Sequence, residues 1–317
     1  MSDVAVEEQE LDCVQLGALI RKTSLGTIRV TGSDRLTWLN GLVTCDLAPR
    51  KPGDAVYGLA VGKTGKILDE VWVLVGEEDL LVGVDSAHAA ELVSTLDRYL
   101  VMEDAEIAEA VGFSWLLAFG ARAKEAVSPA KAAGARAGVT QRAGAPMAVV
   151  CAPSDRVSDV VTAIETSCDP SRVASDAGWY RVRVEHGIAE HGTDFDRENY
   201  PQEPALELDG VSFNKGCYLG QEAVFMLEKR GHVKKRLVQL VVDGPVVVGD
   251  AIASTEGAEI GKVTSAVARA QGSPSTSGRT NLALGYVKYK YAVDGGEVVT
   301  GKSPAKVTAL LAIKPES

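Results

Sequence analysis

The side chains best suited to chemistry lie in residues 215–222, which read K-G-C-Y-L-G-Q-E. Glycines flank Cys217, so the backbone can turn sharply there and present the thiol at a surface. Lys215 precedes the cysteine and a predicted helix over 222–229 follows it, and both an ammonium and the amides of a helix start favour the thiolate. We therefore expect a lowered pKa and a nucleophilic thiol at Cys217. A small buried cysteine in a glycine-rich turn is the alternative interpretation.

The cysteine pattern limits what this thiol can do. No second cysteine lies near Cys217 in the sequence, which excludes a C-x-x-C dithiol and leaves a mixed disulfide, a sulfenate or a transient bond to another protein's metal. The five cysteines are odd in number and scattered, so they form no disulfide framework and indicate a reducing compartment. Because no cysteine or histidine pair has the spacing of zinc ligands, we expect no metal site in this chain.

The composition is that of an ordinary globular protein, with 46% hydrophobic and 24% charged residues. The 33 basic and 43 acidic side chains give a net charge of −10, which argues against a nucleic-acid groove or a basic membrane surface. The first twelve residues carry acids and no base, so they predict a solvated tail rather than a secretory signal. No segment approaches the ~20 apolar residues of a membrane span. We expect a cytoplasmic protein without membrane or nucleic-acid partners. We also expect a monomer, since no apolar stripe demands a partner helix.

Hydrophobic periodicity and turn residues predict mixed helices and strands, then a strand-rich tail. The length of 317 residues suggests about two domains. Residues 121–145 are rich in alanine and glycine and predict a short helix with a loose connection. Helices are predicted at 34–40, 86–100 and 154–166, and strands at 55–61, 67–75, 80–84, 147–152 and 179–184. Short strands at 237–242, 251–254, 259–268, 282–287 and 306–311 indicate a small β-barrel or sandwich.

Residues 211–222, VSFNKGCYLGQE, resemble the signature K-G-C-[FY]-x-G-Q-E of the YgfZ-type folate-binding proteins, relatives of the glycine-cleavage aminomethyltransferase GcvT. Four further segments match that family in the same order, so that the resemblance spans about residues 25–240. They are the run from Gly32 to Leu47, the R-x-E-x-G pattern at 183–187, the P-Q-E at 201–203 and the basic run at 230–236.

The resemblance implies an α+β fold: a folate-binding body of ferredoxin-like subdomains around a central hole over residues 1–236, and a C-terminal β-barrel over 237–317. A subdomain boundary would fall near 121–146. It also implies a role in the synthesis or repair of iron–sulfur clusters. Tetrahydrofolate or a derivative (5-formyl, 5,10-methylene) would be the ligand, iron–sulfur client or assembly proteins the partners, and Cys217 the key residue.

The same resemblance assigns folate contacts. Glu185 takes the place of a carboxylate that accepts hydrogen bonds from the pterin amine and ring N–H, although a strand-end glutamate facing solvent would look the same. Arg230 begins a basic run that would meet the folate carboxylates or an acidic partner, or else form a solvated turn. Tyr218 would stack on a flat ring or belong to the core. Gln221 completes the signature and is assigned to the folate site.

Asp69 supports a second reading of the function. Residues 65–70, GKILDE, resemble the G-G-I-x-D-D of the aminomethyltransferase, whose acid lies beside the reactive nitrogen of folate. The alternative function is therefore a tetrahydrofolate-dependent aminomethyl or methyl transferase with Asp69 as acid and base. YgfZ-type proteins commonly lack this acid, whereas the transferases lack the loop cysteine. The longer cysteine motif favours an accessory protein that is not a conventional enzyme, and a folded interaction module with a vestigial pocket is the third reading.

Overall fold

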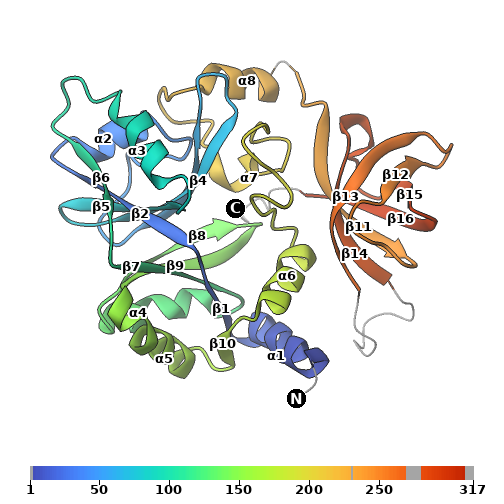
Figure 1. Ribbon diagram of the computed structural model, residues 1–317, viewed down its shortest axis with the longest axis horizontal. Helices are drawn as coiled ribbons and strands as arrows, with labels where there is room; N and C mark the ends of the chain where they lie inside the picture. The colour runs from blue at the N-terminus through green and yellow to red at the C-terminus, as the bar shows by residue number, and fades with distance from the viewer. Residues whose placement is uncertain (1–2, 230, 269–279, 311–317) are drawn as a thin grey trace. The chain divides into compact units, whose positions relative to one another are not determined.

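The computed structural model describes residues 3–229, 231–268 and 280–310 of the chain (Figure 1). These residues divide into two compact units. The first comprises residues 1–179 and 209–221, and the second comprises 180–208 and 222–317. Three helices include the crossing points of the chain: α6 (Asp176–Glu185), α7 (Glu207–Gly210) and α8 (Gln221–Lys229).

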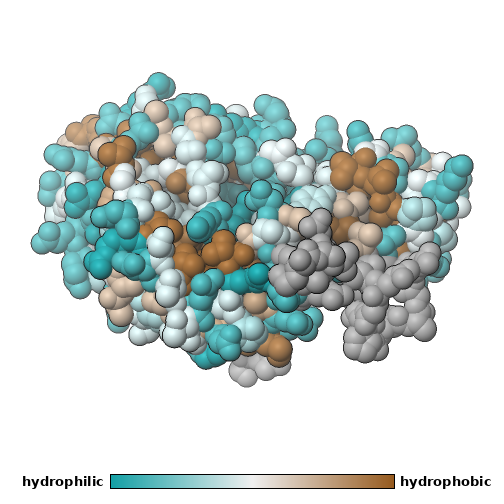
Figure 2. All heavy atoms as spheres, turned by 60° about the horizontal axis from the view of Figure 1, so that its bottom comes forward, coloured by the Kyte–Doolittle hydropathy of each residue, from teal (hydrophilic) through white to brown (hydrophobic). Residues whose placement is uncertain are grey.

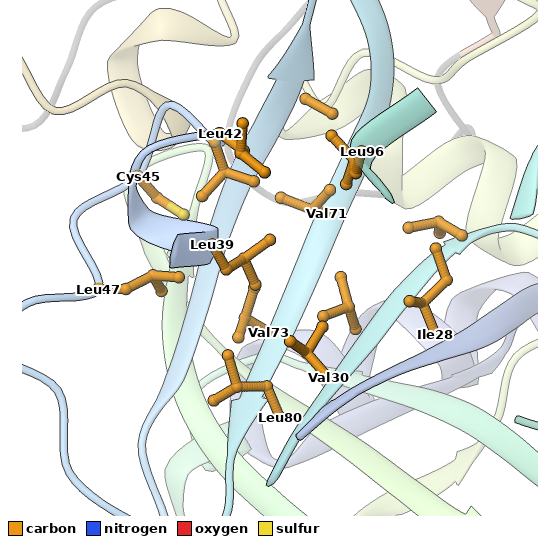
Figure 3. Close-up of a cluster of buried hydrophobic side chains, with 14 of the residues drawn as sticks. Ile28, Val30, Leu39, Leu42, Cys45, Leu47, Val71, Val73, Leu80 and Leu96 are labelled. Carbon is orange, nitrogen blue, oxygen red and sulfur yellow. The ribbon is translucent and has the colours of Figure 1, made fainter. Parts of the chain in front are cut away.

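The first unit contains an antiparallel five-stranded sheet whose strand order is β3-β4-β5-β2-β6. Its strands are β2 (Leu25–Thr31), β3 (Ala55–Val61), β4 (Ile67–Val75), β5 (Asp79–Asp85) and β6 (Glu106–Ala110). Helices α2 (Arg35–Asn40) and α3 (Ala89–Asp97) pack on one face. Figure 3 shows Leu39 of α2 and Leu96 of α3 beside Val71 and Val73 of β4. Valines at every second position place one apolar face of β4 in this core.

A second five-stranded sheet of the same unit has the order β10-β1-β7-β9-β8. Its strands are β1 (Ala18–Lys22), β7 (Phe113–Phe119), β8 (Arg136–Arg142), β9 (Ala145–Pro153) and β10 (Ser171–Val173). The segments η1 (Ala123–Ala126), α4 (Val127–Ala132), η2 (Ser154–Arg156) and α5 (Val157–Ser167) accompany it. Its core is built largely from alanine and valine, so helix and sheet approach closely.

Residues 121–145 contain the predicted short helix, as α4, but the predicted loose connection is wrong, because strand β8 follows that helix. The small residues serve close packing rather than looseness. A Cβ built on Gly138 of β8 would lie 2.7 Å from the backbone nitrogen of Ala55 on β3. The glycine therefore lets the two sheets of this unit come into contact.

The expected N-terminal tail is also wrong, since helix α1 (Asp3–Leu16) occupies it. Glu10 of this helix is 1% exposed. Its Oε1 accepts a 2.6 Å bond from the backbone N–H of Ser175, and its Oε2 a 2.9 Å bond from the Ser175 hydroxyl. Glu10, one of the five acidic residues that suggested a solvated tail, is thus a buried acceptor, whereas Asp12 is exposed.

The strand predicted over 179–184 is wrong as well, because helix α6 covers these residues. Alternating arginine and valine gave the appearance of a half-buried strand, but Arg183 is fully buried. Its Nη1 pairs with Asp194 Oδ2 at 2.6 Å, and Arg181 pairs with Glu185 at 2.9 Å across one helical turn. The strand prediction assumed that the arginines face solvent while the valines face the core. Because Arg183 is buried and paired, that assumption fails.

The second unit contains a closed barrel with the strand order β11-β14-β13-β12-β15-β16. The strands are β11 (Lys235–Asp243), β12 (Ala251–Ser254), β13 (Glu259–Val267), β14 (Thr280–Lys288), β15 (Glu297–Thr300) and β16 (Ser303–Ala309), and the short helix η3 (Tyr289–Tyr291) follows β14. Closure pairs every edge strand. The α+β class and the C-terminal barrel are confirmed, and β15 is the barrel strand that the sequence pattern missed. The boundary at residue 236 and the central hole stay predictions.

The surface drawn in Figure 2 is mainly hydrophilic, with hydrophobic side chains in small separate groups. Within the described residues, every helix is too short or too polar to cross a bilayer.

Candidate functional site

Lys215 fixes the cysteine loop to the segment that follows helix α2. Its Nζ donates hydrogen bonds to three backbone carbonyls, those of Asn40 at 2.6 Å, Val43 at 2.9 Å and Cys45 at 2.6 Å. An ammonium carries three N–H donors, so this set uses all of them. Such bonds from a charged donor are stronger than bonds between neutral groups. The contact joins parts of the chain about 170 residues apart.

Backbone hydrogen bonds extend this attachment on both sides of Lys215. The N–H of Ser212 donates to the carbonyl of Thr44 at 2.9 Å, and the N–H of Leu219 donates to the carbonyl of Gly41 at 3.0 Å. The Thr44 hydroxyl also donates to the carbonyl of Gly210 at 2.6 Å. Residues 210–219 are therefore held along residues 40–45 and not only at one point.

The two glycines of the loop differ in their roles. Gly220 has a φ of +76°, and a Cβ there would lie 2.3 Å from the carbonyl oxygen of Gly62, in the turn between β3 and β4. Gly216 has no positive φ, and a Cβ there would meet open space. The steric requirement lies at Gly220, which brings the loop against the turn that leads into β4.

Cys217 is exposed, whereas the other four cysteines are buried. Burial raises the pKa of Cys45 and of Cys151 to about 12, which keeps these thiols protonated and inert. Helix α8 begins at Gln221, so the helix predicted to follow the cysteine is confirmed. The loop thus presents one accessible thiol on an anchored backbone.

The predicted effect of Lys215 on the thiol of Cys217 stays a prediction, because the observed partners of the ammonium are carbonyls. Burial lowers the pKa of Lys215 to about 8, so the side chain remains mostly charged at pH 7. Its Nζ also lies 5.3 Å from the centre of the Tyr218 ring. The contacts make Lys215 a positioning residue of the loop.

Tyr218 packs inward and is 6% exposed. Its hydroxyl is buried and has no hydrogen-bond partner among the residues that the structure describes. Burial raises the pKa of this hydroxyl, so it stays a donor. Its carbonyl accepts the N–H of Gln221, which ties the loop to the first residue of α8. A buried hydroxyl without a partner is unfavourable unless a ligand or water satisfies it.

Asp69 lies on the valine face of β4, beside the start of α3. Its Oδ1 accepts the backbone N–H of Asp85 at 3.3 Å, and its Oδ2 lies 3.3 Å from Nδ1 of His88. Burial raises the pKa of Asp69 to about 7. Glu70 adds to this rise, and the Asp85 N–H and His88 oppose it. A carboxyl that titrates near neutral pH can exchange a proton under cellular conditions.

Glu70 lies on the opposite face of β4, where the sequence argument did not look. It accepts a 2.7 Å hydrogen bond from the hydroxyl of Tyr57, and its Oε1 is 3.4 Å from Nη2 of Arg142. Nη1 of Arg142 is 3.7 Å from Asp209, and the guanidinium covers the Tyr57 ring. The alternation of side chains along a strand was the available signal, since it sends adjacent acids to opposite faces.

Of Glu185 and Arg230, the two folate contacts predicted outside the cysteine loop, the structure describes only Glu185. Glu185 is the last residue of α6, and its Oε1 accepts a 2.9 Å bond from Nε of Arg181. Gln239 donates to the carbonyls of Val184 and Glu185 and so fixes the helix end. Arg230 lies outside the described residues.

The predicted residues are distributed over the two units. Lys215, Cys217, Tyr218 and Gln221 share one loop, and Asp69 belongs to the same unit, whereas Glu185 belongs to the other. Across the part of the chain that the structure describes, no group of three histidine, cysteine or acidic residues could hold a metal ion.

Replacing Lys215 by methionine should loosen the loop, because three carbonyls lose a charged donor. We expect a loss of about 1–3 kcal/mol in the free energy of unfolding, measured by chemical denaturation. Amide hydrogen exchange at Ser212 and Leu219 should accelerate. The matched control is Lys124→Met, an exposed lysine of the same unit, which should change neither quantity. Wild-type exchange in Lys215→Met would contradict the positioning role.

Asp69→Asn should change how stability depends on pH. The folded pKa of about 7 lies above the ordinary value of 3.8, so the wild type loses stability as pH rises between them and the loss is complete above 7. The asparagine variant lacks this titration, so its stability relative to wild type should rise by about 1–3 kcal/mol from pH 4 to 8. Thermal unfolding across this range measures it, with exposed Asp97→Asn as the control. A constant difference would contradict the raised pKa.

Comparison with known proteins adds three findings. Residues 3–136 match the family described as the GCVT N-terminal domain. The chain is 26% identical to the tRNA-modifying protein YgfZ of Yersinia enterocolitica, over 70% of each chain. It is 28% identical to a mitochondrial iron–sulfur cluster assembly factor IBA57 homolog of Aspergillus fumigatus, over 73% of this chain and 59% of that relative.

Among solved structures, the glycine cleavage system aminomethyltransferase T of Bartonella henselae superposes with a TM-score of 0.76. The match covers 96% of this chain and 88% of that one at 21% identity, which supports the fold. The cysteine loop, the N-terminal domain match and the two sequence relatives agree with one another. Residues 3–136 thus match a GCVT N-terminal domain, and the chain as a whole is similar to YgfZ-type and GcvT-like proteins.

Proposed function

We propose that this protein binds a reduced folate and supports the synthesis or repair of iron–sulfur clusters through the thiol of Cys217. The observation that carries this proposal is the exposed cysteine on a loop that Lys215 holds with three hydrogen bonds. Two relatives support it: one is named as an iron–sulfur cluster assembly factor and the other is YgfZ. The boundary at residue 236, the monomeric state and the cytoplasmic location stay predictions.

The residues present fit a folate. Tyr218 offers a buried hydroxyl that has no partner among the described residues. Glu185 offers a carboxylate whose orientation is fixed by Arg181, and a carboxylate suits the adjacent amine and ring N–H of a pterin. In the first unit, Tyr218 and Gln221 would contact the ligand, and the pterin contact of Glu185, in the second unit, stays a separate prediction. A tetrahydrofolate, when bound, supplies a nitrogen able to carry a one-carbon unit.

The division of roles in the loop follows from its contacts. The thiolate is the form of cysteine that attacks electrophiles and ligates metals, and Cys217 is the thiol that a protein or a cluster can reach. Lys215 and Gly220 fix the backbone on either side of it. In this proposal a partner protein carries the iron–sulfur cluster as a substrate, and this chain presents its positioned thiol to that cluster.

A second function is favoured by Asp69. A general acid or base works best when its pKa lies near the working pH, and burial brings the pKa of Asp69 to about 7. His88 lies 3.3 Å from the carboxyl and is positioned to exchange a proton with it. The GCVT domain match over residues 3–136 includes this strand. A tetrahydrofolate-dependent aminomethyl or methyl transferase is the corresponding activity.

The first proposal predicts that Cys217→Ala fails to restore iron–sulfur enzyme activity in cells that lack this protein, because the positioned thiol is gone. Its unfolding temperature and its calorimetric affinity for 5-formyltetrahydrofolate should match wild type. Gly216→Ala is the matched control within the loop, since its Cβ meets open space, and it should restore activity. Full rescue by Cys217→Ala would refute the thiol mechanism. Absence of folate binding by wild type would refute the folate part separately.

The second proposal predicts turnover when tetrahydrofolate is mixed with an aminomethyl or methyl donor. Asp69→Asn should lower kcat by about 10²-fold or more, in line with the loss of a general acid or base. Asp97→Asn, on the surface of α3, is the control and should keep full activity. If wild type turns over none of the donors, the transferase function is excluded.

A further inference from the structure

A hollow on the barrel includes no residue of the cysteine loop and does not include Asp69. Its volume is about 650 Å³, and its walls are strands β11, β13 and β14 and the loop over residues 192–199. Every lining residue belongs to the second unit. Pockets that bind small organic ligands commonly have ~300–1,000 Å³, so this one has room for such a ligand.

Three lysines converge on this hollow from adjacent strands. Lys235 of β11 stands directly opposite Lys288 of β14, and Lys262 of β13 stands directly opposite Tyr286 of β14. Opposite residues share a face of the sheet, as do residues two apart on one strand, so all four side chains leave the same face. Like charges directly opposite each other destabilise a sheet, and here they occur in a chain of net charge −10. A bound anion would remove this repulsion.

Two of the three acids that line the hollow, Asp194 and Asp196, already accept hydrogen bonds through their carboxylates. Asp194 Oδ2 pairs with the buried Arg183 at 2.6 Å, and Oδ1 accepts hydrogen bonds from Thr264 and Ser265. Asp196 accepts the backbone N–H of Glu198 at 2.8 Å within its own loop. Glu259 also lines the hollow, and its carbonyl accepts a 3.1 Å bond from Lys288. Arg183 also pairs with Glu190 at 3.0 Å, so it is shared between two carboxylates, and the hollow itself is lined by three lysines and three acids.

Tyr286 adds a hydrogen-bond donor among the lysines. Its hydroxyl is buried and has no partner within the described residues, while the Nζ of Lys235 lies 4.5 Å from the centre of its ring. Burial raises the pKa of this hydroxyl, and Glu203, Asp194 and Asp196 add to the rise, so it keeps its proton. An acceptor oxygen from a ligand would satisfy it.

We propose that this hollow binds a small organic anion, whose phosphate or carboxylate group contacts the ammonium groups of Lys235 and Lys288 and accepts a hydrogen bond from Tyr286. The site is separate from the folate and thiol chemistry proposed above and needs none of those residues.

The test uses the full-length protein with inorganic phosphate and succinate as probes, and sodium chloride at equal ionic strength as the reference. One probe or both should raise the unfolding temperature by a few degrees at ~10 mM, because a ligand of the folded state stabilises it. A shift with phosphate alone identifies a phosphate ligand, and one with succinate alone a carboxylate ligand. A shift in sodium chloride as large as in the probes would overturn the proposal.

Variants assign the effect to the hollow. The double variant Lys235→Gln with Lys288→Gln should lose the shift, and Tyr286→Phe should weaken binding about five-fold or more. Lys290→Gln, an exposed lysine close in sequence that does not line the hollow, is the matched control and should keep wild-type binding. An unchanged shift in both the double variant and Tyr286→Phe would refute the site. If only a single-stranded oligonucleotide stabilises wild type, the small-anion proposal is also wrong.

Discussion

The three hydrogen bonds from one ammonium to the carbonyls of residues 40–45 determine where the cysteine of this protein is presented. An ammonium in a partly buried place needs acceptors on all sides, and this turn after α2 provides them. Lys215 is thereby placed by the fold of the first unit, and Cys217 follows two residues later. The signature K-G-C-Y-L-G-Q-E thus combines one anchoring residue, one steric requirement at Gly220 and one exposed thiol.

Side chains alternate along strand β4, so its adjacent acids Asp69 and Glu70 lie on opposite faces. Asp69 faces a hydrophobic core, where burial shifts its pKa toward neutrality, with His88 as its neighbour. Glu70 faces the other sheet and is compensated by Tyr57 and Arg142. The two acids are adjacent in sequence, yet they contact different partners on opposite faces of the strand.

The sequence predicted only part of the regular fold, since β3, β4, β5 and β9 of the first unit were predicted but β1, β2, β6, β7, β8 and β10 were not. Strands at 55–61 and 67–75 were predicted with their observed bounds, because their apolar residues recur at strand spacing between clear turns. It failed where a charged residue is buried: Arg183 made a helix resemble a strand, and Glu10 made a packed helix resemble a tail. The cysteine loop was found from its motif, whereas the partners of Lys215 could not be, since they lie about 170 residues away. Pairing over such distances leaves no local pattern.

The order of the chain gives the attachment of this loop a further meaning. Residues 209–221 belong to the first unit, although residues 180–208 before them belong to the second. During synthesis from the N-terminus, the carbonyls of residues 40–45 are made long before the lysine that binds them. Closing so large a loop costs conformational entropy that only a largely folded first unit can offset. A chain whose first unit is not folded would therefore carry its thiol on an unattached segment, so that correct presentation of the cysteine reports folding of the first unit.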